Sequence, residues 1–66
     1  MTASLSLQLL ERIRAEYLEM PGLVLTPQQA ARFFALTLHE SEHVLARLVS
    51  EKVLFRDVKG AYRRFG

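Results

Sequence analysis

The segment His39-Glu40-Ser41-Glu42-His43 has the residue types and the spacing of a hydrolytic zinc site. Two histidines four residues apart on a helix lie about 40° apart on one face and can both ligate zinc, while the glutamate activates a water molecule. Such a site also needs a third ligand and a cleft that excludes water, and neither can be recognised in this short chain. We therefore expect His39 and His43 to be surface residues without a metal, with adventitious zinc or nickel binding as the alternative.

A second chemical feature is an excess of positive charge near the C-terminus. Residues 52–66 contain five cationic side chains and one carboxylate, whereas residues 1–51 contain four cationic side chains and six carboxylates. The net charge of +2 therefore comes entirely from the C-terminal segment. This asymmetry indicates an anionic partner for that end of the chain. The alternative is a solvated strand edge whose arginines discourage strand-to-strand aggregation.

Length and composition limit the classes of protein to which the chain can belong. Its 66 residues, 50% hydrophobic and 24% charged, suffice for one globular domain with a single core. The sequence has no cysteine, so neither a disulfide nor a thiolate metal site can supplement that core. A catalytic cleft and its supporting shell need a longer chain, so we expect a non-catalytic binding protein without a cofactor or a small-molecule substrate. Without a signal-peptide pattern or a long apolar run, we expect a cytoplasmic protein that does not contact membranes.

The spacing of apolar residues predicts the elements that position these side chains. Residues from about 4 to 20 show helical spacing, and Pro21-Gly22 ends this helix. Residues 23–25 are too few for a helix and are expected to form a short strand or an extended linker. The apolar face of the first helix consists of Leu10, Ile13, Tyr17 and Met20, of which the first three are expected in the core.

Two further helices are each predicted by a capping box, in Thr26 to Gln29 and in Thr37 to Glu40. They would span about 27–35 and about 38–52, joined by a turn so short that they must diverge sharply. The first of them would bury Ala30, Ala31 and Phe34. The apolar arc of the second contains Leu38, Val44, Leu45, Leu48 and Val49, and its polar face contains His39, Glu40, His43, Arg47 and Glu51.

Beyond residue 52 the apolar period changes to two. Residues 53–57 and 61–65 are rich in strand-forming types, and Gly60 lies in the turn between them, where a positive φ is expected. This pattern predicts a β-hairpin over about 53–65.

The order helix, short strand, helix, tight turn, helix and hairpin over about 4–65 resembles the winged helix-turn-helix domain of bacterial transcription regulators. The segments that carry the resemblance are Leu25-Thr26-Pro27-Gln28-Gln29-Ala30-Ala31-Arg32-Phe33-Phe34-Ala35-Leu36-Thr37 and Leu45-Ala46-Arg47-Leu48-Val49-Ser50-Glu51-Lys52-Val53-Leu54. The resemblance implies an α+β, mostly helical fold whose third helix enters the major groove and whose hairpin, the wing, touches the backbone or minor groove. The DNA-contacting residues that it implies are His39, Glu40, His43 and Arg47 on the third helix and Arg56, Lys59, Arg63 and Arg64 in the wing.

Two residues depart from the family pattern. Lys52 stands where such sequences usually have a glycine that turns the chain out of the third helix, and Glu40 places a charge that repels phosphate at the exposed start of that helix.

The function expected from these observations is that of a small DNA-binding protein that regulates transcription by occupying duplex DNA. The alternative is a winged-helix module that binds another protein, which Glu40 and Glu42 favour. A homodimer would suit half-site recognition, and Leu5, Leu7 and Leu9 leave a dimer contact through the first helix as an alternative. Phe33 is expected at the rim of the core, with an exposed position at a partner surface as the alternative.

Overall fold

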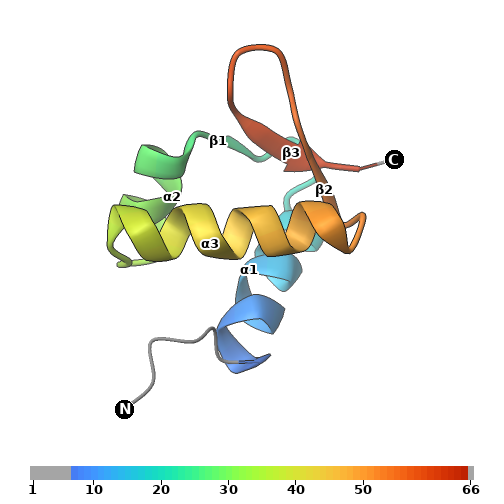
Figure 1. Ribbon diagram of the computed structural model, residues 1–66. Coiled ribbons are helices and arrows are strands. Elements are labelled where there is room, and N and C mark those ends of the chain that lie inside the picture. Colours follow the sequence, from blue (N-terminus) through green and yellow to red (C-terminus); the bar gives the residue numbers. More distant parts are fainter. Residues whose placement is uncertain (1–6, 66) are drawn as a thin grey trace.

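In the computed structural model, the described residues 7–65 form an α+β, mostly helical fold with three helices and one antiparallel sheet of three strands (Figure 1). The coarse fold class predicted from the sequence is therefore confirmed. In chain order the elements are α1 (Leu7–Glu19), β1 (Val24–Leu25), α2 (Pro27–Phe33), α3 (Leu38–Ser50), β2 (Leu54–Arg56) and β3 (Tyr62–Arg64).

The observed bounds are slightly narrower than the predicted ones. Residues 4–6 of the predicted first helix lie outside the described residues, and α1 ends at Glu19. The predicted helices over about 27–35 and 38–52 end two residues earlier, at Phe33 and Ser50. Residues 24–25 form a strand, which decides between the two alternatives left open for that segment.

Both predicted capping boxes are present. The Thr26 hydroxyl accepts a hydrogen bond from the Gln29 amide at 3.2 Å, and the Gln29 side chain accepts one from the Thr26 amide at 2.9 Å. Thr37 and Glu40 form the same reciprocal pair at 3.0 and 2.9 Å. Each box satisfies amides that would otherwise lack a partner in the first turn, so both helix starts are determined locally.

Two residues after the end of α2 and of α3 the chain adopts the left-handed conformation, at Ala35 with φ 57° and at Lys52 with φ 63°. After α3, the amides of Lys52 and Val53 donate to the carbonyls of Val49 and Leu48 at 2.9 Å each. This is the Schellman pattern, in which glycine is usual because a Cβ is strained at positive φ. Lys52 therefore occupies the left-handed position that glycine usually fills in winged-helix sequences.

We expect Lys52→Gly to raise the free energy of unfolding by up to about 1 kcal/mol. The left-handed conformation costs a non-glycine residue about 1–2 kcal/mol, and the larger entropy of glycine in the unfolded chain offsets about half of the gain. Urea unfolding would measure the difference. As a control, Ser50→Gly inside the last turn of α3 should lower stability by about 1 kcal/mol. A loss of stability in Lys52→Gly would contradict this account.

The three strands are arranged in the order β1-β3-β2, so β3 is the central strand. Val24 of β1 and Phe55 of β2 both lie opposite Arg63. The hairpin and Gly60 at φ 85° agree with the prediction. Arg63 and Arg64 lie in β3, which pairs with β1 on one side and with β2 on the other. The alternative that these arginines discourage aggregation at an exposed strand edge is therefore wrong.

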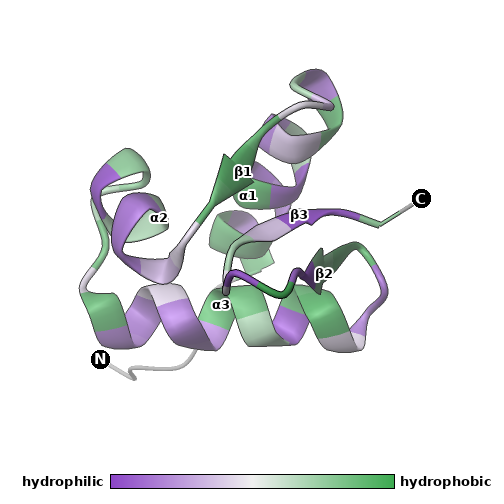
Figure 2. Cartoon of the chain, turned by 90° about the horizontal axis from the view of Figure 1, so that it is seen from above, coloured by the Kyte–Doolittle hydropathy of each residue, from purple (hydrophilic) through white to green (hydrophobic). Residues whose placement is uncertain are grey.

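The core lies where α1 and α3 meet one face of the sheet. Figure 2 shows the apolar residues of α3 in green between its polar ones, and β1 in green beside the largely purple β3. The predicted core residues Leu10, Ile13 and Tyr17 are buried, as are Val44, Leu45 and Leu48. The Tyr17 hydroxyl donates to the Tyr62 carbonyl at 3.0 Å and thereby links α1 to the sheet.

Two residues, Leu38 and Ala31, are less buried than expected. Leu38 is 44% exposed because it lies at the start of α3. Ala31 is only half-buried. Ser41 is completely buried, and its hydroxyl donates to the Pro27 carbonyl at 2.7 Å, which fastens α3 to the start of α2.

Within the described part of the chain, residues 7–65, no helix has the length and apolar character needed to span a membrane.

Candidate nucleic-acid interface

The polar face of α3 presents His39, His43 and Arg47 on successive turns, all exposed. The two imidazole rings lie edge to face with centroids 5.7 Å apart. The Arg47 Nε donates to a Glu51 carboxylate oxygen at 2.7 Å in an exposed ion pair one turn apart. Exposed pairs of this kind contribute about 1 kcal/mol or less, so Arg47 can exchange Glu51 for another acceptor at little cost.

Glu40 has an internal role that accounts for its position. One of its carboxylate oxygens accepts the Thr37 amide of the capping box at 2.9 Å. A carboxylate near a helix N-terminus is also favoured by the helix dipole. Glu40 therefore stabilises the start of α3, and its presence does not depend on a ligand.

The two histidines do not form a recognisable metal centre with other residues. Across residues 7–65 no group of three or more histidine, cysteine, aspartate or glutamate side chains could hold a metal ion. His39 and His43 line a shallow open depression of about 260 Å³ together with Glu42 and Ala46.

The turn of the hairpin is organised by Asp57. One of its carboxylate oxygens accepts the amides of Lys59 at 2.9 Å and Ala61 at 3.0 Å, and the other lies 3.5 Å from the Arg63 Nε. The hydrogen bond from Ala61, followed by that from Lys59 and by the charges of Arg63 and Lys59, holds the pKa of Asp57 below its usual value against the opposing effect of desolvation. The only carboxylate of the hairpin is therefore already used by the hairpin itself.

The pairing register places three of the four hairpin cations, Arg56, Arg63 and Arg64, on two faces of the sheet, whereas Lys59 lies in the turn. Residues directly opposite each other on paired strands share a face. Arg56 lies opposite Tyr62 and Arg64 opposite Leu54, on the face that packs against the core. Arg63 lies on the other face with Val24 and Phe55. The sequence neighbours Arg63 and Arg64 therefore point in opposite directions.

Three of these cations have no ion-pair partner among the described residues. Arg56, Lys59 and Arg64 have no carboxylate within 4 Å in residues 7–65, whereas Arg63 pairs with Asp57. Arg56 reaches over the turn, since a Cβ added at Gly60 would lie 3.6 Å from its terminal nitrogen. The hairpin therefore carries its uncompensated positive charge at Lys59 on the turn, at Arg56 beside it and at the half-buried Arg64.

No family model, curated protein or solved structure matches the chain.

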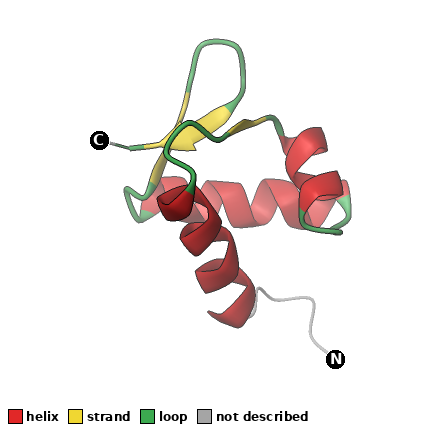
Figure 3. Cartoon of the chain, turned by 180° about the vertical axis from the view of Figure 1, so that it is seen from behind, coloured by secondary structure: helices red, strands yellow, loops and turns green. Residues whose placement is uncertain are grey.

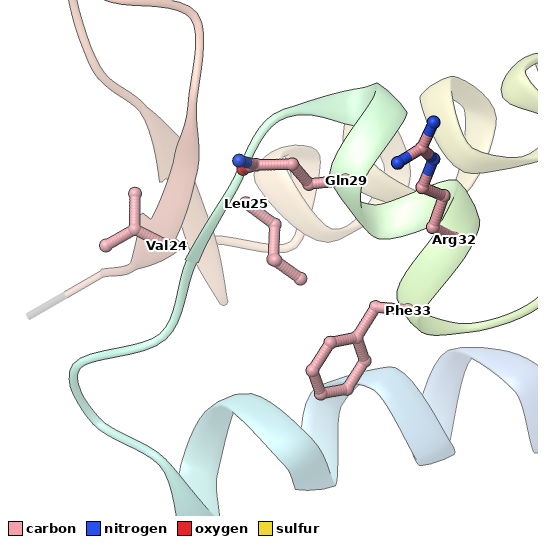
Figure 4. A pocket seen from close by; sticks show the side chains of 5 residues that line it. All are labelled: Val24, Leu25, Gln29, Arg32 and Phe33. Carbon is pink, nitrogen blue, oxygen red and sulfur yellow. The ribbon is translucent and has the colours of Figure 1, made fainter.

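An apolar surface between β1 and α2 was predicted only in part, through the alternative of an exposed Phe33. Val24, Leu25 and Phe33 line an open pocket of about 400 Å³, with Gln29 and Arg32 at its border (Figure 4). Phe33 is 47% exposed, and its ring lies 4.9 Å from that of Phe34, so it is neither fully buried nor free of the core. The alternation of residues around Leu25 could have indicated that Val24 faces outward.

Proposed function

We propose that the chain is a winged helix-turn-helix module that binds duplex DNA, with α3 in the major groove and the hairpin on the phosphate backbone. The observation that carries the proposal is the group of unpaired cations, Arg56, Lys59 and Arg64, on the hairpin. Only residues 51–53 separate α3 from β2, and the hairpin rises beside the C-terminal end of α3 (Figure 1).

Phosphate is the anion that suits this arrangement. Each cation that neutralises a phosphate releases counterions from the duplex, which gives affinity that is independent of sequence and decreases with salt. Asp57 is occupied by two amides and Arg63, and its charge attracts Lys59 only from beyond ion-pair distance, so no carboxylate of residues 7–65 pairs with Arg56, Lys59 or Arg64. Arg56 and Lys59 are both exposed, whereas Arg64 is half-buried, so the first two are assigned the main backbone contacts.

The exposed face of α3 supplies the groups that would contact base edges. His39, His43 and Arg47 lie on one face at one-turn spacing, and arginine pairs with guanine in the major groove. Three acidic residues lie on or next to this face. Glu40 accepts the Thr37 backbone amide of the capping box, Glu51 pairs with Arg47, and no hydrogen bond or ion pair of Glu42 is seen within residues 7–65. These contacts explain why Glu40 and Glu51 are present, but both carboxylates keep their negative charge, so the affinity for DNA is assigned to the hairpin cations.

The test is a titration of a labelled random-sequence duplex between about 50 and about 200 mM salt, with Arg56→Gln and Lys59→Gln combined in one variant. We expect the affinity to fall about tenfold or more and the slope of log K against log salt to become shallower by up to about 2, because two phosphate contacts are lost. The matched control combines Arg12→Gln with Arg32→Gln, which removes the same charge from α1 and α2 and should change affinity by about twofold at most.

Equal losses in both variants would assign the effect to net charge and would contradict a specific role of the hairpin. The absence of duplex binding at about 50 mM salt would overturn the proposal. In that case the second candidate, a non-catalytic module that binds another protein, would be supported by the open apolar pocket lined by Val24, Leu25 and Phe33, of which Phe33 is 47% exposed.

A further inference from the structure

The outer face of α1 carries a stripe of four exposed residues, Leu7, Glu11, Arg14 and Leu18. Steps of four, three and four residues keep them within an arc of about 60° on a helix. Leu7 is 69% exposed and Leu18 is 50% exposed, so both ends of the stripe are apolar side chains in solvent. Seen from behind, α1 lies in front of α3, and no other helix or strand of residues 7–65 lies over it in that view (Figure 3).

The stripe is complementary to itself when two copies run antiparallel. Its members are placed symmetrically about the point between residues 12 and 13. Two antiparallel helices centred there would bring Leu7 against Leu18 of the other copy and Glu11 against Arg14 of the other copy. A two-fold axis repeats each contact, which gives two leucine pairs at the ends and two ion pairs in the middle.

We propose that α1 is a homodimer contact in which two copies of this chain pair antiparallel through Leu7, Glu11, Arg14 and Leu18. Along the stripe the residues are apolar, acidic, basic and apolar. A second copy running antiparallel presents leucine to leucine and glutamate to arginine, so the stripe fits another copy of itself better than an unrelated partner. Charged residues beside an apolar seam are known to set the choice and orientation of paired helices. Ala15, small and exposed next to the stripe, allows the two helices to approach closely.

The remaining residues of α1 leave this face available. Leu10, Ile13 and Tyr17 attach α1 to the core on a neighbouring arc. The Arg12 guanidinium lies 5.9 Å from the centre of the Phe34 ring, on another side of the helix. The stripe contains no residue of α3 or of the hairpin, so this inference does not rest on the proposed DNA binding.

The contact is small, and the dimer should therefore be weak. A helix of 13 residues is about 20 Å long, and two such helices bury less than the roughly 1,200 Å² of a stable interface. We expect a dissociation constant no tighter than micromolar, which sedimentation equilibrium can measure.

The central experiment reverses the charges one at a time. A homodimer of Glu11→Arg has two contacts between the new arginine and Arg14, and a homodimer of Arg14→Glu has two between the new glutamate and Glu11. These like-charge contacts should make each variant alone dimerise at least about tenfold more weakly. An equimolar mixture of the two variants restores two opposite-charge pairs and should form heterodimers about as strongly as the unmodified protein does. The double variant Glu11→Arg with Arg14→Glu should regain self-association. Glu19→Arg, a charge reversal on α1 outside the stripe, is the control and should associate like the unmodified protein.

The orientation can be tested by cross-linking because the chain has no cysteine. Under mild oxidation a mixture of Leu7→Cys and Leu18→Cys should give mainly the mixed disulfide, since these positions meet only in the antiparallel pair. A predominance of Leu7→Cys joined to itself would indicate a parallel pair and would overturn the proposal. A protein that stays monomeric at about 1 mM, or single-reversal variants that do not associate on mixing, would overturn it as well. Circular dichroism of each variant establishes that α1 is still folded.

Discussion

Replacing Leu45 by alanine should lower the free energy of unfolding by about 2–5 kcal/mol. Leu45 is 1% exposed in the middle of α3, where that helix meets the rest of the core. The substitution removes buried methyl groups and leaves a cavity that a rigid core fills incompletely. Because a chain of 66 residues has a total stability of about 3–10 kcal/mol, the substitution should remove a large share of it. Urea unfolding followed by circular dichroism measures the change.

Leu38→Ala is the matched control for this experiment. Leu38 begins the same helix, and the apolar arc predicted from the sequence contains it, but it is 44% exposed. Its substitution should therefore cost about 1 kcal/mol or less. If both variants lost the same stability, the placement of α3 against the core would be wrong by a rotation about its axis.

The second large effect should appear at alkaline pH. Tyr17 is fully buried, and this burial raises the pKa of its phenol from 10.0 to about 12. Below pH 10 the phenol is neutral in both states, and its contribution to stability is complete. Between pH 10 and 12 the unfolded chain loses the proton while the folded protein keeps it, so stability should fall by about 1.4 kcal/mol per pH unit.

The variant that tests this effect is Tyr17→Phe. At pH 8 it should be less stable than the unmodified protein by about 1–2 kcal/mol, because the Tyr62 carbonyl loses the hydrogen bond of 3.0 Å. Above pH 10, however, its stability should fall less steeply. Urea unfolding at several pH values from about 8 to about 11.5 gives both quantities, and identical slopes in the two proteins would show that Tyr17 ionises as easily in the folded state as in the unfolded one.

The starts of α2 and α3 could be predicted because their signals are local. Thr26 and Thr37 each lie three residues before a glutamine or glutamate, and the two capping boxes close within one helical turn. The hairpin could be predicted for the same reason, since Gly60 supplies the positive φ that its turn requires. The buried face of α1 followed from the 3.6-residue period of Leu10, Ile13 and Tyr17.

The candidate interface was less predictable, because the position of a charge in sequence does not show which face of a sheet carries it. The adjacent Arg63 and Arg64 are one basic cluster in the sequence, but the β3 register turns them to opposite faces, and Arg63 is paired with Asp57. Similarly, the sequence shows the negative charge of Glu40, but only the structure shows that its carboxylate caps α3 by accepting the Thr37 backbone amide. The stripe on α1 could be assigned to the surface only after the packing had shown which of its leucines stay outside the core.

The sequence by itself therefore determined where the helices and the hairpin begin and turn, because caps, glycine and apolar periodicity act over a few residues. Only the tertiary structure decided that β1 pairs with β3, residues 24–25 against 62–63, because that pairing joins segments almost 40 residues apart and no local preference selects the partner. The tertiary structure also decided that Ser41 is buried. Its hydroxyl can enter the core of this protein only because α2 brings the Pro27 carbonyl to within 2.7 Å of it.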